Sequence, residues 1–564
     1  MDFNIRKPKK WEAILSFTAV LWGLLLINIY AGEWFFRLDL TEEKRYTISK
    51  GTRAMLEDLD DVVYVEVYLE GDLNAGFKRL QKSIRETLEE FRYYAGSRLE
   101  YKFVDPYDVP NRRAVARRQK ELADRGLTPT YLNEQADGER IQKVIFPGAI
   151  ISYRGREQAV QLLKGNKGAS PQEQLNQSAE GVEYELGSAI RQLSTKEKPK
   201  VAILGGHESL RPVDLQDFRG RLEKRYWVDR IRMGEKPLAD YDAIIMAQPK
   251  KRFSEEEVFE LDQYVVNGGK ALLMIDKVQM NLDSIAIGGT YAFGYDLGIE
   301  DWLFRMGIRV NNNLVQDIQA GMIEVQAGNF GNQRQVKPMP WPYYVYLNKF
   351  SDHPVVRNMD VVYGKFLSTL DTVVAEGVEK TPLIYTSNRT RIKEVPTIVD
   401  LNEMQQDMRS KEFQTLFTAG HTPIAYLLEG TFTSLYANIG APPSNLNAPV
   451  TKKGESKVVV VGDADIIRNE IDPRTQKPEP IDFDKYRSQN MSNMDFVFNS
   501  LSYMLDEDGI INARKKRVTL RPLDAIRVKE ERTYWQLLNI VMPVVVVAIF
   551  GFAYVYWRKK KYSR

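Results

Sequence analysis

The sequence predicts an α/β protein in which two globular parts are held between two membrane-spanning helices. The chain has 564 residues, more than one hydrophobic core covers, so several domains are expected. Apolar β-branched runs alternate with amphipathic stretches through most of its length, which is typical of strands alternating with helices. Charged residues make up 27% of the chain, yet Ala13–Gly32 and Thr533–Trp557 contain none.

The C-terminal charge-free run, residues 533–557, is predicted to be a transmembrane helix. At about 1.5 Å per residue it covers the roughly 30 Å hydrocarbon core of a bilayer. Trp535 and Trp557 stand at its two ends, where amphipathic rings are enriched, and Pro543 near its start is tolerated in a membrane helix. A buried core helix is the alternative interpretation, but the basic tail 558–564 follows directly and could not be buried with it.

The N-terminus repeats this pattern, with a basic tail (1–11) before an apolar segment (12–36) that contains Trp22. A cleaved signal peptide is the alternative, but the apolar part is longer than usual and no Ala-x-Ala site follows it. We therefore expect a second membrane anchor. The short basic tails predict that both termini lie in the cytoplasm and that the body between the anchors lies outside.

Composition excludes several classes of function. The net charge of +3 is too balanced to indicate a nucleic-acid-binding protein. The absence of cysteine excludes disulfides, thiolate metal sites and cysteine nucleophiles. We expect no cofactor.

The first globular part, 37–195, shows the order β-α-β-α-β-β-α, which predicts a thioredoxin-like domain. The expected strands are 62–69, 99–104, 143–153 and 158–163, and the expected helices are 77–94, 111–125 and 174–193. Arg154-Gly155-Arg156 predicts the hairpin turn between the last two strands. Pro147 stands where such folds carry a cis-proline, so a cis bond is expected there.

Without cysteine this domain cannot perform thiol chemistry. It is either a binding or docking module or a structural spacer. The predicted helix 111–125 has a basic face, which is interpreted as solvated surface rather than as a binding site: Arg112, Arg113, Arg117 and Arg118.

The second globular part, 196–510, predicts a doubly wound parallel sheet with a large insertion at about 280–455. Its expected strands are 201–206, 242–247, 271–275 and 457–461, and its expected helices are 215–226, 255–267 and 494–505. Residues 280–455 are rich in Gly, Asn and Pro, with short strands at 383–386 and 424–428. Residues 511–532 are the expected juxtamembrane segment.

Several stretches in this order are similar to the GldG family, the gliding-motility-associated proteins of an ABC-transporter-type complex. They are Gly205-Gly-His-Glu208, Leu261-Asp-Gln-Tyr-Val-Val-Asn-Gly-Gly-Lys270, Met339-Pro-Trp-Pro-Tyr343, Val459-Val-Val-Gly-Asp463 and the ending Arg521–Asp524 through Glu531–Trp535 with the last span. The resemblance covers nearly the whole chain. It implies that the second part is a GIFT-type Rossmann-like domain, that the membrane is a bacterial inner membrane, and that a permease and a separate ATPase are partners.

Polar residues after two of the predicted parallel strands form the candidate ligand or partner cleft. His207 and Glu208 follow the first strand, and Asp463 and Asp465 follow a later one. Ligands of open α/β sheets bind beyond the carboxyl ends of the strands, so these four groups converge if their strands are neighbours. A metal, sugar or peptide site is one interpretation; ordinary turn and helix-cap chemistry is the other and is favoured.

The sequence contains none of the three enzyme motifs considered, which are the zincin, nucleophile-elbow and P-loop motifs. His207-Glu208 lacks the second His of a zincin, and no Gly-x-Ser-x-Gly elbow occurs. Gly268-Gly-Lys-Ala lacks both the leading glycine and the hydroxyl of a P-loop, so ATP hydrolysis by that route must belong to another chain. His353 and His421 stand alone and are interpreted as local structure.

The favoured function is therefore a non-catalytic, membrane-anchored accessory subunit of an ABC-transporter-like complex. The resemblance implies roles in gliding motility and type IX secretion, with an envelope partner outside the membrane. The alternative is a saccharide- or peptide-capturing component, for which aromatic residues could stack on sugars: Trp302, Trp341, Tyr343, Tyr344 and Tyr346. A hydrolase acting through Glu208 with Asp463 or Asp465 is disfavoured.

Overall fold

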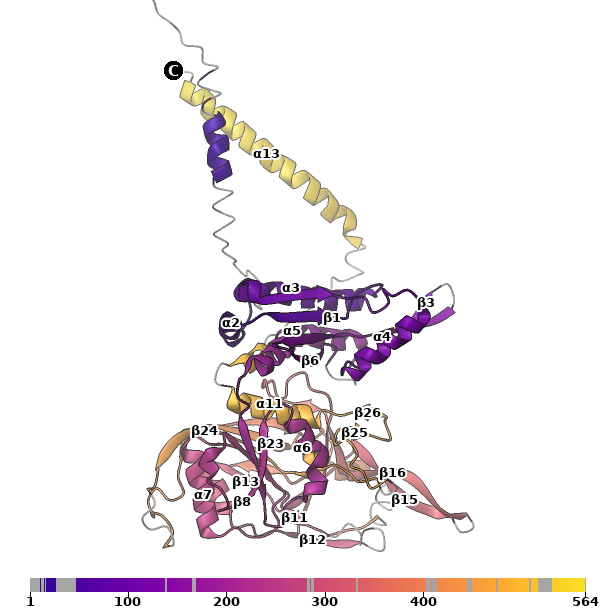
Figure 1. The fold of residues 1–564 in the computed structure, drawn as a ribbon, viewed down its shortest axis with the longest axis vertical. Coiled ribbons are helices and arrows are strands. Elements are labelled where there is room, and N and C mark those ends of the chain that lie inside the picture. Colours follow the sequence, from indigo (N-terminus) through magenta and orange to yellow (C-terminus); the bar gives the residue numbers. More distant parts are fainter. Residues whose placement is uncertain are drawn as a thin grey trace, which may run out of the picture. The chain divides into compact units, whose positions relative to one another are not determined.

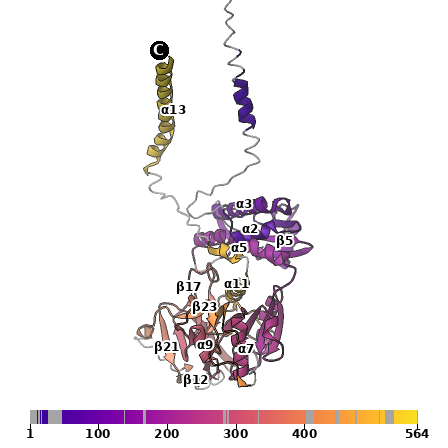
Figure 2. The same cartoon turned by 90° about the vertical axis from the view of Figure 1, so that its left-hand side faces the viewer.

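The computed structural model describes residues 11, 15, 17–26, 47–515 and 530–562, except for ten short internal segments. Those segments are 137–138, 165–168, 281–284, 286–288, 331–332, 402–406, 408–412, 444–448, 473–474 and 507–508. The chain divides into two compact units, Met1–Lys516 and Arg517–Arg564. Figure 1 and Figure 2 show the ribbon in two perpendicular views.

The second unit contains one long helix, α13 (Arg532–Tyr562), which continues five residues beyond the predicted span and through the basic residues 558–561. It is the one helix among the described residues that is long and apolar enough to cross a membrane. It includes Trp535, Pro543 and Trp557.

At the N-terminus a short apolar helix is described at Phe17–Leu26, and it carries an exposed Trp22. Most of the remaining predicted anchor (12–36) and residues 1–10 lie outside the described residues. The two-pass topology therefore stays a prediction.

Within the first unit, residues 47–195 form lobe 1, built on a four-stranded sheet of order β2-β1-β5-β6. β1 is parallel to β2 and antiparallel to β5, and β5 and β6 form a hairpin. The elements are α2 (Lys50–Glu57), β1 (Val63–Val67), α3 (Ala75–Ala95), η1 (Gly96–Arg98), β2 (Leu99–Phe103), α4 (Arg112–Asp124), β3 (Thr130–Ala136), β4 (Glu139–Ile145), β5 (Gly148–Tyr153), β6 (Arg156–Gln161) and α5 (Pro171–Ser194).

Side-chain alternation explains the layers of lobe 1. Val63, Val65 and Val67 point from β1 into a core shared with the apolar faces of α3 and α5. Ile150 of β5 points to the face opposite that of its neighbours Ala149 and Ile151, and it packs with Leu122 of α4 in a smaller core. Thus α3 and α5 cover one face of the sheet and α4 covers the other.

Two details of lobe 1 differ from expectation. β3 and β4 form an additional hairpin, and only the end of the single strand predicted at 143–153 belongs to the main sheet. The expected cis bond before Pro147 is wrong, because the cis X-Pro bond of the described residues is Val395–Pro396. The predicted turn at Arg154-Gly155 is confirmed, and both residues have positive φ.

Lobe 2, residues 196–506, is built on an eight-stranded sheet of order β17-β20-β23-β24-β10-β9-β7-β8. The five strands from β24 to β8 are parallel, and β23, β20 and β17 extend the sheet in antiparallel fashion. The sheet elements and their helices are β7 (Lys200–Gly205), η2 (Pro212–Leu215), α6 (Gln216–Leu222), β8 (Trp227–Arg232), η3 (Leu238–Asp240), β9 (Ala243–Ala247), α7 (Glu255–Val266), β10 (Lys270–Met274), α9 (Glu300–Met306), β17 (Lys349–Phe350), β20 (Val378–Tyr385), β23 (Pro423–Thr433), β24 (Lys453–Val461), η6 (Asp465–Ile467) and α11 (Asn493–Leu505).

Helices cover both faces of this sheet. Alternate strand residues pack against α6 and α11 on one face and against α7 and α9 on the other, which explains the near-continuous apolar strands. The predicted insertion, about 280–455, is only partly separate, because its strands β17, β20 and β23 join the central sheet.

The rest of the insertion forms smaller sheets beside the central one. They are built from β11 (Val278–Gln279), β12 (Thr290–Gly294), β13 (Ile308–Val310), β14 (Asn313–Asp317), β15 (Ala320–Phe330), β16 (Gln333–Leu347), β18 (Val362–Lys365), β19 (Leu370–Thr372), β21 (Thr390–Glu394) and β22 (Thr397–Val399). The remaining short elements are η4 (Phe413–Leu416), β25 (Phe483–Asp484) and β26 (Gln489–Asn490).

After lobe 2 the chain returns to lobe 1. The short helix η7 (Ile510–Lys515) places Ile510, Ile511 and Ala513 in the core of lobe 1. Lobe 1 therefore contains both the first and the last described residues of the body.

Candidate functional site

A cluster of polar side chains lies at the carboxyl ends of three neighbouring strands of lobe 2. Gln248 follows β9, Asp276 follows β10, and Asp463 to Asp465 follow β24. These strands are adjacent in the sheet, in the order β24-β10-β9. This edge is where open α/β sheets place their ligands, so it is the natural place to look for a site.

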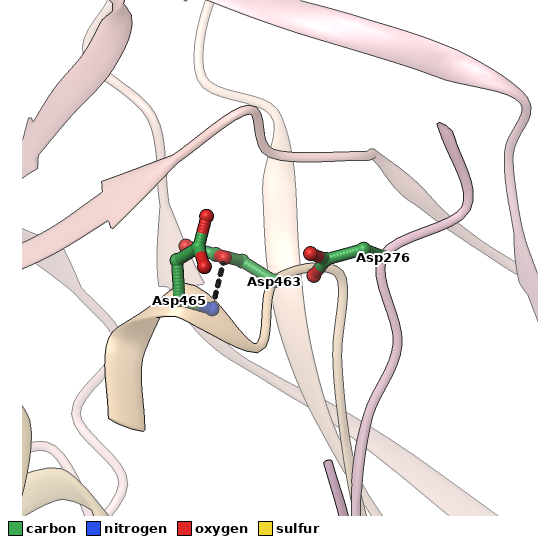
Figure 3. A group of neighbouring side chains, drawn as sticks. All are labelled: Asp276, Asp463 and Asp465. Atoms are coloured by element: carbon green, nitrogen blue, oxygen red, sulfur yellow. Dashed lines mark hydrogen bonds between the residues drawn. The ribbon is translucent and has the colours of Figure 1, made fainter. Parts of the chain in front are cut away.

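Three carboxylates meet here, those of Asp276, Asp463 and Asp465 (Figure 3). One oxygen from each lies within 4.8 Å of the others. Asp463 is completely buried and Asp276 nearly so. Three carboxylates this close in a low-dielectric environment repel one another strongly unless protons or a cation compensate.

Backbone N–H groups hold the carboxylates in place. Oδ1 of Asp276 accepts from the N–H of Ala464 at 2.6 Å. Asp463 accepts from the N–H of Asp465 at 2.7 Å and from that of Lys365 at 2.9 Å. These bonds tie the loop after β10, the loop after β24 and the end of β18 into one junction.

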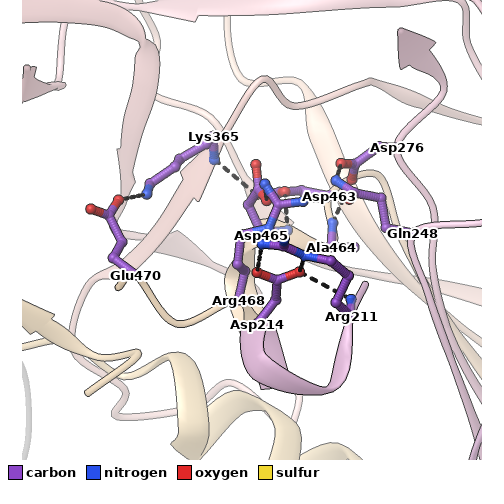
Figure 4. A network of polar contacts seen from close by, with 10 residues as sticks. All are labelled: Arg211, Asp214, Gln248, Asp276, Lys365, Asp463, Ala464, Asp465, Arg468 and Glu470. Carbon is purple, nitrogen blue, oxygen red and sulfur yellow. Dashed lines mark hydrogen bonds and ion pairs between the residues drawn. The ribbon is translucent and has the colours of Figure 1, made fainter. Parts of the chain in front are cut away.

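Arg468 supplies the positive charge of the junction (Figure 4). Its guanidinium lies 2.8 Å from Asp465 and also donates to the amide oxygen of Gln248. Gln248 in turn donates to Asp276 and adopts a positive φ of 56°, which is uncommon for a non-glycine residue. Nearby, Arg211 makes two 2.9 Å bonds to Asp214.

Burial and repulsion change the protonation of these groups. Burial, followed by the charge of Asp465, raises the pKa of Asp276 to about 7. Burial, followed by Asp276 and Asp465, raises the pKa of Asp463 well above its ordinary value. The carboxyl groups of the junction therefore keep protons to a higher pH than ordinary aspartates do, in addition to facing the Arg468 cation.

The three carboxylates have the residue types of a cation site, but their partners are already present. Arg468 occupies the side of Asp465, and Gln248 and backbone N–H groups occupy oxygens of Asp276 and Asp463. These hydrogen bonds and the ion pair join the ends of the strands to one another, and they do not leave the carboxylate oxygens arranged as open metal ligands.

The structure brings together only half of the predicted cleft. Asp463 and Asp465 are neighbours, as expected, but β7 is separated from β24 by β9 and β10, roughly 14 Å at strand spacing. His207 bonds Glu257 at 3.1 Å and stacks on Phe253. Glu208 is exposed and pairs with Lys251 at 2.9 Å. The condition for convergence, that the strands are neighbours, is not met, and the Glu208–Asp463 hydrolase pair loses its geometric basis.

The aromatic residues considered for sugar stacking are mostly core. Trp302, Trp341, Tyr343 and Tyr346 are each at most 3% exposed. Trp341 and Tyr343 pack against one another with ring centroids 5.3 Å apart. Their burial leaves the saccharide-capture alternative without its proposed platform.

Sequence reasoning missed Asp276, Gln248 and Arg468. Asp276 directly follows the predicted strand 271–275, so its position at the edge of the sheet could have been predicted from the sequence. Its contact with Asp463 was not, because it depends on β24 joining β10 across more than a hundred intervening residues.

Comparisons with known proteins agree with this division of the chain. Residues 198–500, which lie within lobe 2, match a family described as "ABC-type uncharacterized transport system". Residues 42–152, mostly in lobe 1, match a domain family of unknown function.

Two single proteins are also similar. An uncharacterized protein of Borreliella burgdorferi is 20% identical over 577 residues, covering 98% of this chain and 99% of that protein. A structure described as the mmIFT52 N-terminal domain matches 55% of this chain and 97% of its own, with 13% identity and a TM-score of 0.31.

Proposed function

This chain belongs to the family of auxiliary components of ABC-type transport systems, and we propose that it is a non-catalytic, membrane-anchored accessory subunit of such a complex. The observation that carries the proposal is the family match over residues 198–500, which contains all eight strands of the central sheet of lobe 2.

The apolar helix α13 supports the membrane part of the proposal. None of the most apolar part of α13 is buried against other residues of its unit, so its surface is available for lipid or for a membrane partner. Because the sequence has no P-loop, the proposed complex obtains ATP hydrolysis from a separate ATPase and its pathway from a permease.

The finer assignment rests on the resemblance to the GldG family. We propose a role in gliding motility and type IX secretion, with both termini in the cytoplasm, the body in the periplasm and an envelope partner. The sheet order of lobe 1 supports a thioredoxin-like domain without redox chemistry, and the three-layered lobe 2 supports a GIFT-type Rossmann-like domain.

Co-purification tests the proposal. The full chain, tagged and solubilised from native membranes in mild detergent, is expected to retain a polytopic permease and an ATPase. A matched preparation with Val546→Arg in α13 is expected to lose both. Recovery of the native chain alone, from membranes in which both subunits are present, would contradict the proposal.

A further inference from the structure

Both ends of the described body meet on a single helix, α5. α2 is the first helix of lobe 1, and the backbone N–H of Ser49, just before it, donates to Glu183 of α5 at 2.6 Å. η7 is the last element of the body and packs on the same helix. A β-carbon on Gly187 of α5 would lie 3.7 Å from both Thr52 of α2 and Ile510 of η7. The entry and the exit of the body therefore share one joint (Figure 2 shows α2 and α5).

Arg514 of η7 connects this joint to lobe 2. Its guanidinium lies 4.9 Å from the ring centroid of Tyr184 in lobe 1 and donates to Oδ1 of Asn499, in α11, at 2.9 Å. It also donates to the backbone carbonyl of Arg357. One side chain at the exit of the body thus contacts both lobes.

The groups around Arg514 make further hydrogen bonds, both within lobe 2 and between the two lobes. Asn499 donates to the carbonyl of Val355 at 2.9 Å, and its Oδ1 lies 3.4 Å from the hydroxyl of Tyr184. Glu180 of α5 accepts from Asn358 at 3.1 Å and lies 3.7 Å from Arg357. Glu180 of α5 therefore holds segment 355–358 of lobe 2 directly, and Arg514 of η7 adds a second contact through the Arg357 carbonyl.

A cavity of about 750 Å³ adjoins these contacts and is lined by both lobes. Its walls include Tyr184, Asn499 and Arg514. The lobes thus meet here through discrete polar contacts beside open space, an arrangement that a displacement can change.

We propose that η7 is a coupling strap, through which movement of the segment leading to α13 changes the contact between the two lobes. Pulling η7 away from α5 removes Arg514 from Asn499 and from the Arg357 carbonyl together, so segment 355–358 keeps its contacts with Glu180 but is held less firmly against lobe 1. This proposal rests on the proposed function in one respect only, namely that the force displacing η7 comes from the transport complex through α13.

The absence of cysteine makes a reversible test possible. In the full chain, the double variant Gly187→Cys with Ile510→Cys allows a disulfide (the staple) to form between α5 and η7. The single variant Gly187→Cys is the control. Hydrogen exchange of residues 355–359 is measured in oxidised and reduced forms. Oxidation is expected to slow exchange in this lobe 2 segment about tenfold, the effect of one charge-assisted hydrogen bond on a local opening. No change in that segment on oxidation overturns the proposal.

A second variant tests the route. Arg514→Gln in the stapled background is expected to abolish the effect of oxidation on residues 355–359, whereas Arg113→Gln on the exposed face of α4 is expected to preserve it. A redox effect that survives Arg514→Gln overturns the role of Arg514. Since these measurements use the isolated chain, their failure is separate from failure to find a permease.

Discussion

The backbone N–H of Ala464 donates a 2.6 Å hydrogen bond to the carboxylate of Asp276, joining the ends of two adjacent strands. The two residues are 188 positions apart in the chain. This contact fixes β24, which follows the long insertion, beside β10, which precedes it. The main structural role of the carboxylate junction is therefore to hold β24 next to β10 in the central sheet of lobe 2.

Protonation of the junction makes stability depend on pH. The folded-state pKa of Asp276 is about 7, against about 3.9 in an unfolded chain, so the folded state binds more protons between these values. By linkage, the contribution of Asp276 to the free energy of unfolding falls as pH rises from about 4 to about 7 and levels off above that. Thermal unfolding of the full chain across this range measures the slope.

The variant Asp276→Asn tests this assignment, since its amide resembles the protonated acid. We expect the slope between about pH 4 and 7 to shrink and the variant to exceed the native chain in stability at pH 8. Asp296→Asn, at an exposed aspartate, is the control and should leave the slope unchanged. An unaltered slope in Asp276→Asn would refute the account of the junction.

Arg468 is expected to be essential to the fold. Replacing it with Met leaves the nearly buried Asp465 beside two other carboxylates, and removal of one partner from a buried pair costs about 3 kcal/mol. Arg252→Met, which breaks the exposed pair with Asp296, should cost less than about 1 kcal/mol. Chemical denaturation compares the two; equal losses would show that Arg468 does not compensate the cluster.

Gly462 and Gly220 should respond oppositely to alanine. A β-carbon on Gly462 would lie 2.1 Å from the backbone oxygen of Ser368, so the loop after β24 must shift, at a cost of about 1–3 kcal/mol or more. Gly220 in α6 has nothing within 4 Å, and alanine there should stabilise the helix by about 0.5–1 kcal/mol. Unfolding midpoints of both variants against the native chain decide this, and a tolerated Gly462→Ala would argue against the packing described.

The membrane role of α13 predicts a position-dependent effect of charge. Arginine at Val546, near the middle of the apolar run, should disfavour insertion by roughly 2.5–3.5 kcal/mol. Arginine at Thr533, at the end of the run, should have little effect because it can reach the interface. Because the predicted anchor at 12–36 would by itself retain the chain in membranes, the measurement is the accessibility of a tag after residue 564 from the outer side of the inner membrane. The tag should become accessible in Val546→Arg and stay protected in Thr533→Arg, and equal protection in both variants would contradict a spanning α13.

Much of lobe 2 was readable from local sequence. The apolar runs that became β7, β9, β10 and β24 are strands buried on both faces, for which continuous hydrophobicity is the expected pattern. β8 was missed because Asp229, Arg230 and Arg232 interrupt its apolar residues, as is common at the edge of a sheet. The β3–β4 hairpin was missed because only part of it was recognised as extended.

The site was only half readable for a related reason. Residues at strand ends can be listed from the sequence, but the order of strands in the sheet depends on packing between distant segments. Asp463 and Asp465 were identified, whereas His207 and Glu208 were grouped with them although two strands intervene. The burial of Trp341 and Tyr343 likewise depends on their neighbours, since aromatic residues occur in both cores and binding platforms.

The central claim, that α13 anchors an accessory subunit to a transport complex, is tested most directly by photo-crosslinking in the native membrane. A photoreactive residue is placed in turn at Val546 and Phe550 of α13, with Tyr131 of lobe 1, exposed and outside the helix, as the control position. The account predicts that the α13 positions capture one polytopic permease that Tyr131 does not. Capture of no protein from either position, in membranes that contain an ABC-type permease and ATPase, would contradict it.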